Sequence, residues 1–415
     1  MQPARRRPVV LARDNSQQRR HRPDYTLLMI SVLLLVIGLI VVYAISPGLS
    51  AQRDVGENYF VTKQLTAIGL GVLAFAAVAA VPLQRWRQLR KPLLIAAAVA
   101  TLISLVMPVS AEYPAHRWIR FGGISLQSVE LVKLALIVCL AAFLEERIRA
   151  GALSNSKKTL QPLLMVLAGL SAVVAVAQKD LGSTAVIVAV MAAMAFVAGL
   201  PLLRILQVGA IVAVGLMILI LPFSYRRDRI TTFLNPERDC QTAGYQACQA
   251  LIAVGSGGIF GKGLAHSGQA YGYLPEAAND SIFAIIAEKF GFVGVTLLLC
   301  LFVAFFARIK NIMERAPDNF SRLIVAGVLA WLSTQTLINI GAMIGLLPLK
   351  GITLPFISYG GTSVVFVTAA IGLVFNISRY TTYAVNTEIE GSIDENSPDR
   401  RRNRRPYYAT TSRRP

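Results

Sequence analysis

The chain contains ten apolar runs whose lengths suit helices that cross a lipid bilayer. A helix needs about 20 residues to span the hydrocarbon core. Of its 415 residues, 55% are hydrophobic, and the mean hydropathy of +0.57 is far too apolar for a soluble protein of this length. We therefore predict an all-α polytopic membrane protein with about ten transmembrane helices. The predicted spans are Thr26–Ile45, Gln64–Val81, Pro92–Val109, Gln127–Leu144, Pro162–Ala177, Ser183–Ala198, Leu203–Leu221, Ile282–Phe306, Leu323–Ile344 and Leu354–Ile377.

Polar segments divide the sequence into a membrane domain and two ends. Residues 1–24 and 381–415 are charged and rich in Pro, Ser and Arg, which predicts disordered arms. Residues 25–380 form one predicted membrane domain, because no polar insert is large enough to fold separately. Its longest connection is the loop 222–281, between the seventh and eighth spans. A loop of this length implies either a function or disorder, and its aromatic and apolar content favours order.

The net charge of +19 follows the predicted sides of the membrane. Of the 41 Lys and Arg residues, 28 lie in the two ends and in alternate connections, whereas the short connections on the opposite side hold only 6. This pattern follows the positive-inside rule and predicts cytoplasmic termini, with the loop 222–281 outside. It argues against nucleic acid as a partner. The Arg-rich ends are expected to contact anionic lipids, at about 1 kcal/mol per basic residue near the surface.

Two of the four cysteines share the long loop, and the other two lie in predicted spans. Spacing alone does not establish the geometry of a disulfide between Cys240 and Cys248, so both the bonded and the free state stay open. Cys139 and Cys300 are interpreted as small packing residues. The three histidines are far apart, and no Cys/His cluster has structural-zinc spacing, so we predict no protein-held metal site.

Two carboxylates stand where the long loop meets the eighth span. Glu276 and Asp280 lie between a glycine-rich segment and the apolar run that begins at Ile282. An ionisable side chain is costly to keep at membrane depth, so it is a candidate functional residue. We take Asp280 as the candidate catalytic residue and Glu276 as a candidate substrate-binding residue.

The segment 255–263 is rich in glycine. It is not a P-loop, because Ser256 and Gly263 stand where that motif needs Gly and Ser or Thr. Two interpretations stay open. The segment is either a flexible turn beside the bilayer, or a set of backbone N–H donors that binds a lipid-linked diphosphate together with Lys262.

Two other segments on the predicted outer side carry charge. Glu130 and Lys133 are three residues apart in the fourth span, so they can pair on one helical face. The pair is either purely structural or shapes a polar cavity with Arg117 at its rim. The segment 178–183 is most simply a turn in which Asp180 caps the next helix.

Prolines and glycines break helical structure at membrane depth between Asn339 and Ser363. Irregular backbone is tolerated there only where it is buried in protein or lines a cavity. All of these segments open towards the predicted outer side. Together they predict an outward-facing polar cavity with a central carboxylate and basic groups around its rim, which suits an anionic, lipid-anchored substrate.

These residues resemble the SEDS family (shape, elongation, division and sporulation), whose known members FtsW and RodA are bacterial peptidoglycan glycosyltransferases. The resemblance covers nearly the whole membrane domain and is most specific in its C-terminal block. The spacing of 267–273 and the sequence of 351–358 lean towards the division type. The matching stretches are 244–246, 274–276, Asp280, 282–286 and 339–363.

The resemblance implies an inverting glycosyltransferase that polymerises lipid II at the outer face of the bacterial cytoplasmic membrane. The family's catalytic aspartate matches Asp280, which would deprotonate the 4-hydroxyl of the acceptor sugar as the general base. Such a base must be ionised near neutral pH and within hydrogen-bond reach of the hydroxyl. The departing diphosphate needs positive charge or a divalent cation such as Mg²⁺ or Mn²⁺. The expected substrate-binding residues are Arg117, Glu130, Lys133, Lys262, Glu276, Lys350 and Ser358.

The resemblance also implies a class B penicillin-binding protein as transpeptidase partner, within a larger assembly of division or elongation proteins. Two other functions stay open on sequence alone: a transporter that flips lipid II, and a non-catalytic scaffold. Several positions depart from the family pattern without removing Asp280, and Ala270 in place of a frequent lysine puts a phosphate-binding role there in doubt. The other departures are Ser128, Val129, Lys179, Ser183, Ala278, Asn279 and Lys289.

Overall fold

The computed structural model describes residues 18–20, 22–108, 115–121, 124–220, 233, 240–242, 244–264 and 266–382. These residues are mostly helical, with two short pairs of strands. Most of the two predicted disordered arms (1–24 and 381–415), and most of the first part of the loop 222–281, lie outside the described residues. The described parts of these arms include residues 18–20, which pair as a strand with residues 380–382.

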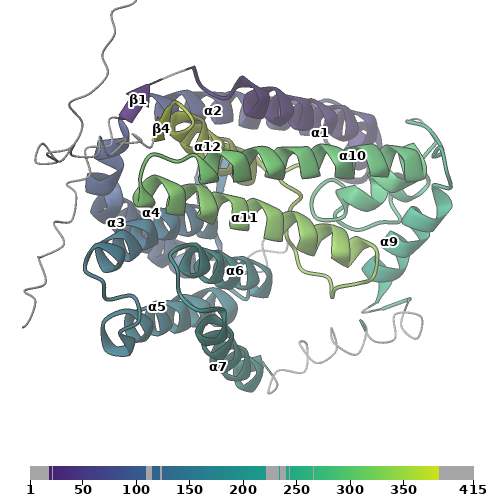
Figure 1. Cartoon of the computed structure of the whole chain (residues 1–415). Coiled ribbons are helices and arrows are strands. Elements are labelled where there is room, and N and C mark those ends of the chain that lie inside the picture. The colour runs from purple at the N-terminus through teal and green to yellow at the C-terminus, as the bar shows by residue number, and fades with distance from the viewer. Residues whose placement is uncertain are drawn as a thin grey trace, which may run out of the picture. The chain divides into compact units, whose positions relative to one another are not determined.

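Each of the ten predicted apolar runs overlaps a helical segment, and these segments are packed side by side (Figure 1). Six helical segments in the described part of the chain are long and apolar enough to cross a membrane. The chain is therefore an all-α polytopic membrane protein, as predicted. The segments are α1 Tyr25–Gln52, α2 Tyr59–Ala80, α3 Leu83–Val106, α4 Ser128–Arg149, α5 Gln161–Ala172 with π-helical turns at Ser156–Leu160 and Val173–Ala177, α6 Leu181–Val197, α7 Leu202–Ile220, α10 Ile282–Glu314, α11 Asn319–Met343 and α12 Gly361–Ile377.

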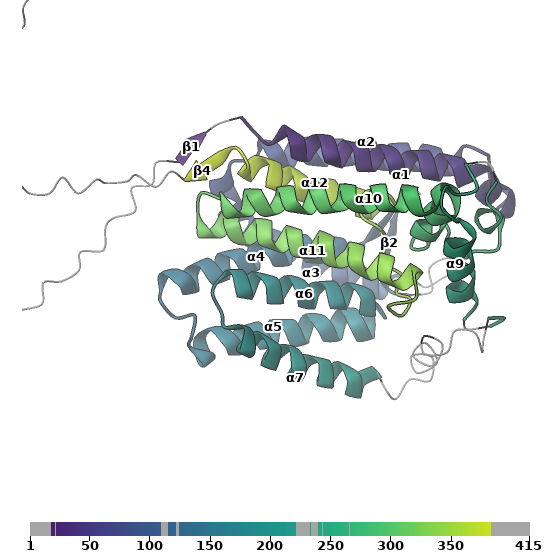
Figure 2. The same cartoon turned by 45° about the vertical axis from the view of Figure 1, so that its right-hand side comes forward.

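The connections gather at two opposite ends of the helices (Figure 2). One end carries α9 (Tyr245–Ser256) and a 3₁₀ turn at Gln269–Tyr271. The other carries β1 (Gln18–Arg20), which pairs antiparallel with β4 (Tyr380–Thr382). A second pair, β2 (Trp118–Phe121) and β3 (Ile124–Gln127), precedes α4. We call the two ends of the helices the α9 end and the β1–β4 end. The chain path brings the predicted site residues to the α9 end.

The last predicted span begins too early. The prediction placed its start at Leu354, whereas α12 begins at Gly361. Residues 350–360 form an irregular segment in which Phe356 has a left-handed φ of 67°. Pro355 has no N–H to continue a helix there. The predicted break in helical structure is thus confirmed, although its length was underestimated.

Glycines let this irregular segment and the helices approach one another closely. A Cβ on Gly38 of α1 would lie 2.6 Å from the Cα of Ile357. Between α2 and α12, a Cβ on Gly372 would lie 2.7 Å from the carbonyl oxygen of Phe75. Small residues allow such backbone contact between packed membrane segments. The segment 350–360 is therefore held against α1 as closely as one helix against another.

Ion pairs connect the helices at the β1–β4 end. Arg87 of α3 lies 2.9 Å from Glu145 of α4 and 2.9 Å from Asp318, which caps α11. Arg308 of α10 lies 2.7 Å from Asp24, which caps α1. These charges tie helix ends together on the side where the positive-inside pattern predicts the cytoplasm.

Candidate active site

Asp280 closes a tight turn that leads directly into α10. Glu276 begins the turn with a left-handed φ of 51°. Its carbonyl oxygen accepts hydrogen bonds from the N–H groups of Asn279 at 2.9 Å and Ser281 at 3.2 Å. Asp280 is half-buried, whereas Glu276 is exposed and its carboxylate accepts a hydrogen bond from the Asn279 amide. The turn thus directs only the Asp280 carboxylate towards the neighbouring helices.

Two side-chain amides donate hydrogen bonds to Asp280, and one glycine lies near its carboxylate. Gln246 of α9 donates through Nε2 to Oδ1 of Asp280 at 3.4 Å and to Oγ of Ser281 at 3.1 Å. Asn339 of α11 donates to the backbone oxygen of Asp280 at 2.7 Å. A Cβ on Gly351 would lie 3.8 Å from Oδ2. The aspartate therefore sits where α9, α11 and the segment 350–360 meet.

Ser358 joins the irregular segment to the turn that carries Asp280. Its hydroxyl donates to the carbonyl oxygen of Asn279 at 2.6 Å and accepts from the N–H of Leu354 at 2.7 Å. The N–H of Tyr359 donates to the carbonyl oxygen of Ala278 at 2.8 Å. Ser358 is a predicted substrate-binding residue, and these contacts show that it also holds the two segments together.

Glu130 and Lys133 form the ion pair predicted from their spacing. The two groups are 2.8 Å apart, and both side chains are buried in the first turns of α4. Lys133 also donates to Oε1 of Gln335 on α11 at 3.1 Å and lies 4.6 Å from the Trp331 ring centroid. A buried charge that is paired and hydrogen-bonded in this way is the arrangement that membrane interiors tolerate.

Arg117 and Lys350 reach the same turn from different segments. Nη1 of Arg117 lies 3.5 Å from Oδ2 of Asp180. Asp180 caps α6 as predicted, because Oδ1 accepts from the N–H of Ser183 at 2.9 Å. A Cβ on Gly182 would lie 3.2 Å from the Cβ of Lys350. Two predicted basic residues thus both lie beside the turn 178–183, and Lys350 precedes Gly351, which lies near the Asp280 carboxylate.

Lys262 is engaged elsewhere in the structure. Its Nζ lies 3.0 Å from Oε1 of Glu288, a carboxylate with no exposed surface. Ser267 donates to the other oxygen of Glu288 at 2.5 Å, and the N–H of Gln269 lies 3.3 Å from it. Lys262 and Glu288 therefore fasten the segment 262–269 to α10.

The glycine-rich segment pairs with a kink in α10. Gly291 interrupts the helix with φ 62° and ψ −164°. The N–H groups of Lys262 and Gly263 donate to the carbonyl oxygens of residues 288 and 289 at 2.9 and 3.0 Å. In return, residues 292 and 293 donate to those of Gly258 and Ile259. The second interpretation of the sequence assigned the backbone N–H groups of this segment to a diphosphate. In the structure, those of Lys262 and Gly263 donate instead to carbonyl oxygens of α10 beside its kink.

A disulfide joins Cys240 to Cys248 of α9, with the two Cα atoms 5.6 Å apart. It connects the long loop to the helix that carries Gln246. Of the two states left open by the sequence, the structure has the bonded one. Cys139 and Cys300 are free.

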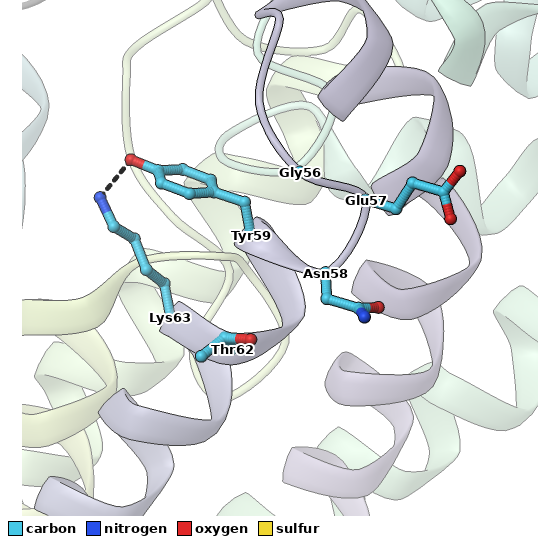
Figure 3. Close-up of a pocket in the computed structure, with 6 residues that line it drawn as sticks. All are labelled: Gly56, Glu57, Asn58, Tyr59, Thr62 and Lys63. Carbon is cyan, nitrogen blue, oxygen red and sulfur yellow. Dashed lines mark hydrogen bonds between the residues drawn. The ribbon is translucent and has the colours of Figure 1, made fainter.

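A surface hollow of about 420 Å³ lies at the turn between α1 and α2, also at the α9 end (Figure 3). Exposed side chains such as Glu57, Asn58 and Lys63 line it, and Asp280 does not. The cavity expected beside Asp280 stays a prediction. Within the described residues, no group of three or more His, Cys, Asp or Glu side chains is placed to hold a metal ion.

The structure brings most of the predicted site residues into one connected set around Asp280. Ser358 belongs to it through the carbonyl oxygen of Asn279, Arg117 and Lys350 lie beside the turn 178–183, and the buried pair in α4 joins it through Gln335. Lys262 lies with Glu288 instead. Sequence reasoning assigned no role to Gln246, Gln335 or Asn339. The signal that could have found them is a side-chain amide within an apolar run, because such groups bond across packed helices.

The chain is similar to known proteins over nearly its whole length. A family model described as "Cell cycle protein", which covers FtsW, RodA and SpoVE, matches residues 25–383. Stage V sporulation protein E of Bacillus subtilis (strain 168) is 38% identical over 362 residues, covering 87% of this chain and 98% of that protein. A probable peptidoglycan glycosyltransferase FtsW of Thioalkalivibrio sp. (strain K90mix) is 36% identical over 379 residues, covering 89% and 92%.

Solved structures share this arrangement of helices. A chain from work on a peptidoglycan synthase complex that coordinates polymerization and crosslinking matches with a TM-score of 0.70 at 25% identity, covering 86% of this chain and 98% of that one. The rod shape determining protein RodA of Thermus thermophilus matches with a TM-score of 0.61 at 26% identity, covering 86% and 97%. Because the family model runs from α1 to the end of β4, and the relatives match over almost their full lengths, the chain belongs to the FtsW/RodA/SpoVE family.

Proposed function

We propose that this protein is an inverting peptidoglycan glycosyltransferase that polymerises lipid II at the outer face of the bacterial cytoplasmic membrane, with Asp280 as its general base. The observation that carries the proposal is the placement of Asp280. Its carboxylate is half-buried at a helix entry and accepts a hydrogen bond from Gln246 of α9, while its backbone oxygen accepts one from Asn339 of α11. Relatives named as peptidoglycan glycosyltransferases support the reaction class.

The proposed step moves one proton and exchanges one bond. The Asp280 carboxylate takes the proton of the acceptor's 4-hydroxyl, and that oxygen bonds to the anomeric carbon of the donor sugar. The bond from this carbon to the diphosphate breaks, so undecaprenyl diphosphate leaves with the electron pair and the carbon is inverted. The proton on Asp280 then passes to water. A general base of this kind contributes about 10²- to 10⁴-fold to the rate.

The leaving diphosphate needs positive charge where it departs. We assign this role to Arg117 and Lys350, which both lie beside the turn 178–183. Lys262 is a weaker candidate, because its ammonium is already paired with Glu288. A divalent cation would supply the same charge. Because one carboxylate and two amides are too few ligands to hold such a cation by themselves, it would be held mainly by the diphosphate oxygens.

The proposed orientation places the α9 end outside and both termini in the cytoplasm. The positive-inside pattern supports this orientation, and a disulfide in the loop before α9 suits an oxidising compartment. We further propose a class B penicillin-binding protein as the crosslinking partner, by similarity to the synthase complex. Anionic lipids are proposed contacts of the Arg-rich ends. The relatives named FtsW support a role in division.

Polymerisation by the purified full-length chain and its partner tests this function. Wild-type protein in lipid nanodiscs should convert fluorescent lipid II into a ladder of glycan products. Asp280→Asn, normalised to folded protein by size-exclusion chromatography, should lose about 10²-fold or more of this rate. Asp54→Asn is a matched control, because it makes the same change in the exposed turn between α1 and α2.

Three outcomes would contradict the proposal and separate it from its rivals. If the protein moves lipid II across liposome membranes without forming polymer, it is a transporter. If Asp280→Asn polymerises at the wild-type rate, Asp280 is not the base. A chain that recruits its partner but polymerises nothing in either form is a scaffold.

A further inference from the structure

Two side-chain amides on α11 link the candidate base to the rest of the site. Gln335 and Asn339 are four residues apart, so they lie on the same face of the helix, one turn from each other. Each is 1% exposed. We call these two residues the amide pair. Most buried polar groups bond within the protein, so the partners of these amides show what they hold in place; among the described residues, Oδ1 of Asn339 has no hydrogen-bond partner.

The orientation of Gln335 follows from the groups around it. Oε1 faces Nζ of Lys133 at 3.1 Å and Nε1 of Trp331 at 2.8 Å. Both are groups that can only donate, so the carbonyl oxygen of the amide must be the atom that faces them. Nε2 then faces Thr353, donating to its backbone oxygen at 2.9 Å and its hydroxyl at 3.3 Å. The buried ammonium of Lys133 thus sets which way Gln335 points.

Asn339 is oriented by acceptors alone. Nδ2 donates at 2.7 Å to the backbone oxygen of Asp280 and at 2.7 Å to that of Ile352. Carbonyl oxygens can only accept, so the NH₂ group must be the atom between them. One amide therefore bridges the turn that carries the candidate base and the segment that carries Lys350 and Gly351.

We propose that Gln335 and Asn339 are positioning residues for the glycosyl transfer, with Lys133 as the charged anchor that orients Gln335. This inference rests on the proposed function, because the amide pair can position a general base only if Asp280 is that base. Asn339 sets the spacing between Asp280 and residues 350–352, and Gln335 holds the same segment one helical turn away. A misplacement of about 1 Å in a reacting group can cost on the order of 10²-fold in rate. Neither amide touches the substrate in this scheme.

Variants that keep the shape of each side chain but change its hydrogen bonding test whether the amide pair acts through its hydrogen bonds or only through packing. Gln335→Glu keeps an oxygen towards Lys133 and Trp331, and replaces the donor that faces Thr353 with a second oxygen. It therefore keeps an acceptor on the α4 side, where its added negative charge faces Lys133, and removes the donor on the side that faces the irregular segment. Asn339→Asp likewise keeps the shape of the side chain and places an oxygen against two carbonyl oxygens. Thr336→Val is the matched control, because among the described residues the Thr336 hydroxyl bonds only to Leu332 of its own helix.

The experiment measures lipid II polymerisation by the full chain with its partner in nanodiscs, per folded molecule, as a function of lipid II concentration. We expect Gln335→Glu and Asn339→Asp to lower kcat on the order of tenfold or more, with KM within about twofold of wild type. Thr336→Val should match wild type in both. Hydrogen exchange of residues 351–354, followed by mass spectrometry, should be faster in the two amide variants and unchanged in Thr336→Val.

The outcomes separate this inference from the proposed function. Amide variants with wild-type kcat per folded molecule, or with unchanged exchange at 351–354, overturn the inference alone. An equal fall of kcat in Thr336→Val shows a general packing effect and also overturns it. A wild-type chain that does not polymerise lipid II overturns the proposed function and this inference with it.

Discussion

Nζ of Lys262 lies 3.0 Å from Oε1 of Glu288, yet the two side chains differ completely in exposure. The lysine is 40% exposed and the glutamate is 0% exposed. Removing the lysine therefore leaves the buried carboxylate without the ammonium 3.0 Å away, with only the neutral donors Ser267 and Gln269, among the described residues, still bonded to it. Removing the carboxylate instead leaves an ammonium that water can solvate. The loss of one partner from a buried pair is costly chiefly because of the charge that stays behind.

Lys262→Gln should consequently destabilise the protein more than Glu288→Gln. We expect a loss of about 3 kcal/mol for Lys262→Gln. For Glu288→Gln, whose amide oxygen can still accept from Ser267, we expect about 1 kcal/mol. The double variant should recover part of the loss caused by Lys262→Gln. Thermal unfolding in detergent micelles measures all three, and equal losses in the two single variants would contradict the asymmetry.

Gly291→Ala should disrupt the hydrogen bonds between the glycine-rich segment and the kink in α10. The backbone at Gly291 is essentially restricted to glycine, and a Cβ there would lie 2.3 Å from the backbone nitrogen of Gly261. We expect a loss of about 3 kcal/mol or more from strain and overpacking together. Gly69→Ala is the matched control, because a Cβ at that helical position meets nothing within 4 Å. A thermal midpoint for Gly291→Ala equal to that of the control would disprove the close approach.

Gln246→Leu should slow polymerisation without unfolding the protein. It removes the amide that donates to Oδ1 of Asp280 at 3.4 Å and to Ser281. One hydrogen bond of ordinary strength is worth about 0.5–1.5 kcal/mol, which corresponds to about twofold to tenfold in rate. Gln249→Leu, the same change on the same helix, should polymerise at the wild-type rate. The comparison is made with labelled lipid II, and similar rates for both variants would remove Gln246 from the site.

The disulfide between Cys240 and Cys248 should be detectable from outside the cell. In a Cys139→Ser/Cys300→Ser background, a membrane-impermeant maleimide should label intact spheroplasts only after reduction. Labelling before reduction would show free thiols, and labelling only after lysis would place the loop inside. Cys240→Ser/Cys248→Ser should remove the signal and lower stability by about 2–3 kcal/mol. Both effects of Cys240→Ser/Cys248→Ser are measured relative to the Cys139→Ser/Cys300→Ser chain without further change.

Local features of the site could be predicted because neighbours in sequence decide them. The Glu130–Lys133 pair needs only helical spacing, and the Asp180 cap needs only the residues that follow it. The start of α12 was predicted wrongly because the local pattern there is ambiguous. Residues 354–357 are apolar and buried whether they are helical or irregular, so hydropathy does not tell the two states apart.

The sequence by itself determined that this chain crosses the membrane many times, which connections share a side, and that Asp280 stands at the entry to a helix. Apolar length and charge placement carry this information, because the bilayer acts on each segment separately. Only the tertiary structure decided which groups reach Asp280 and that Lys262 turns to Glu288. Asn339 and Asp280 are 59 residues apart, and contacts at such separations depend on how helices pack, which no local pattern records.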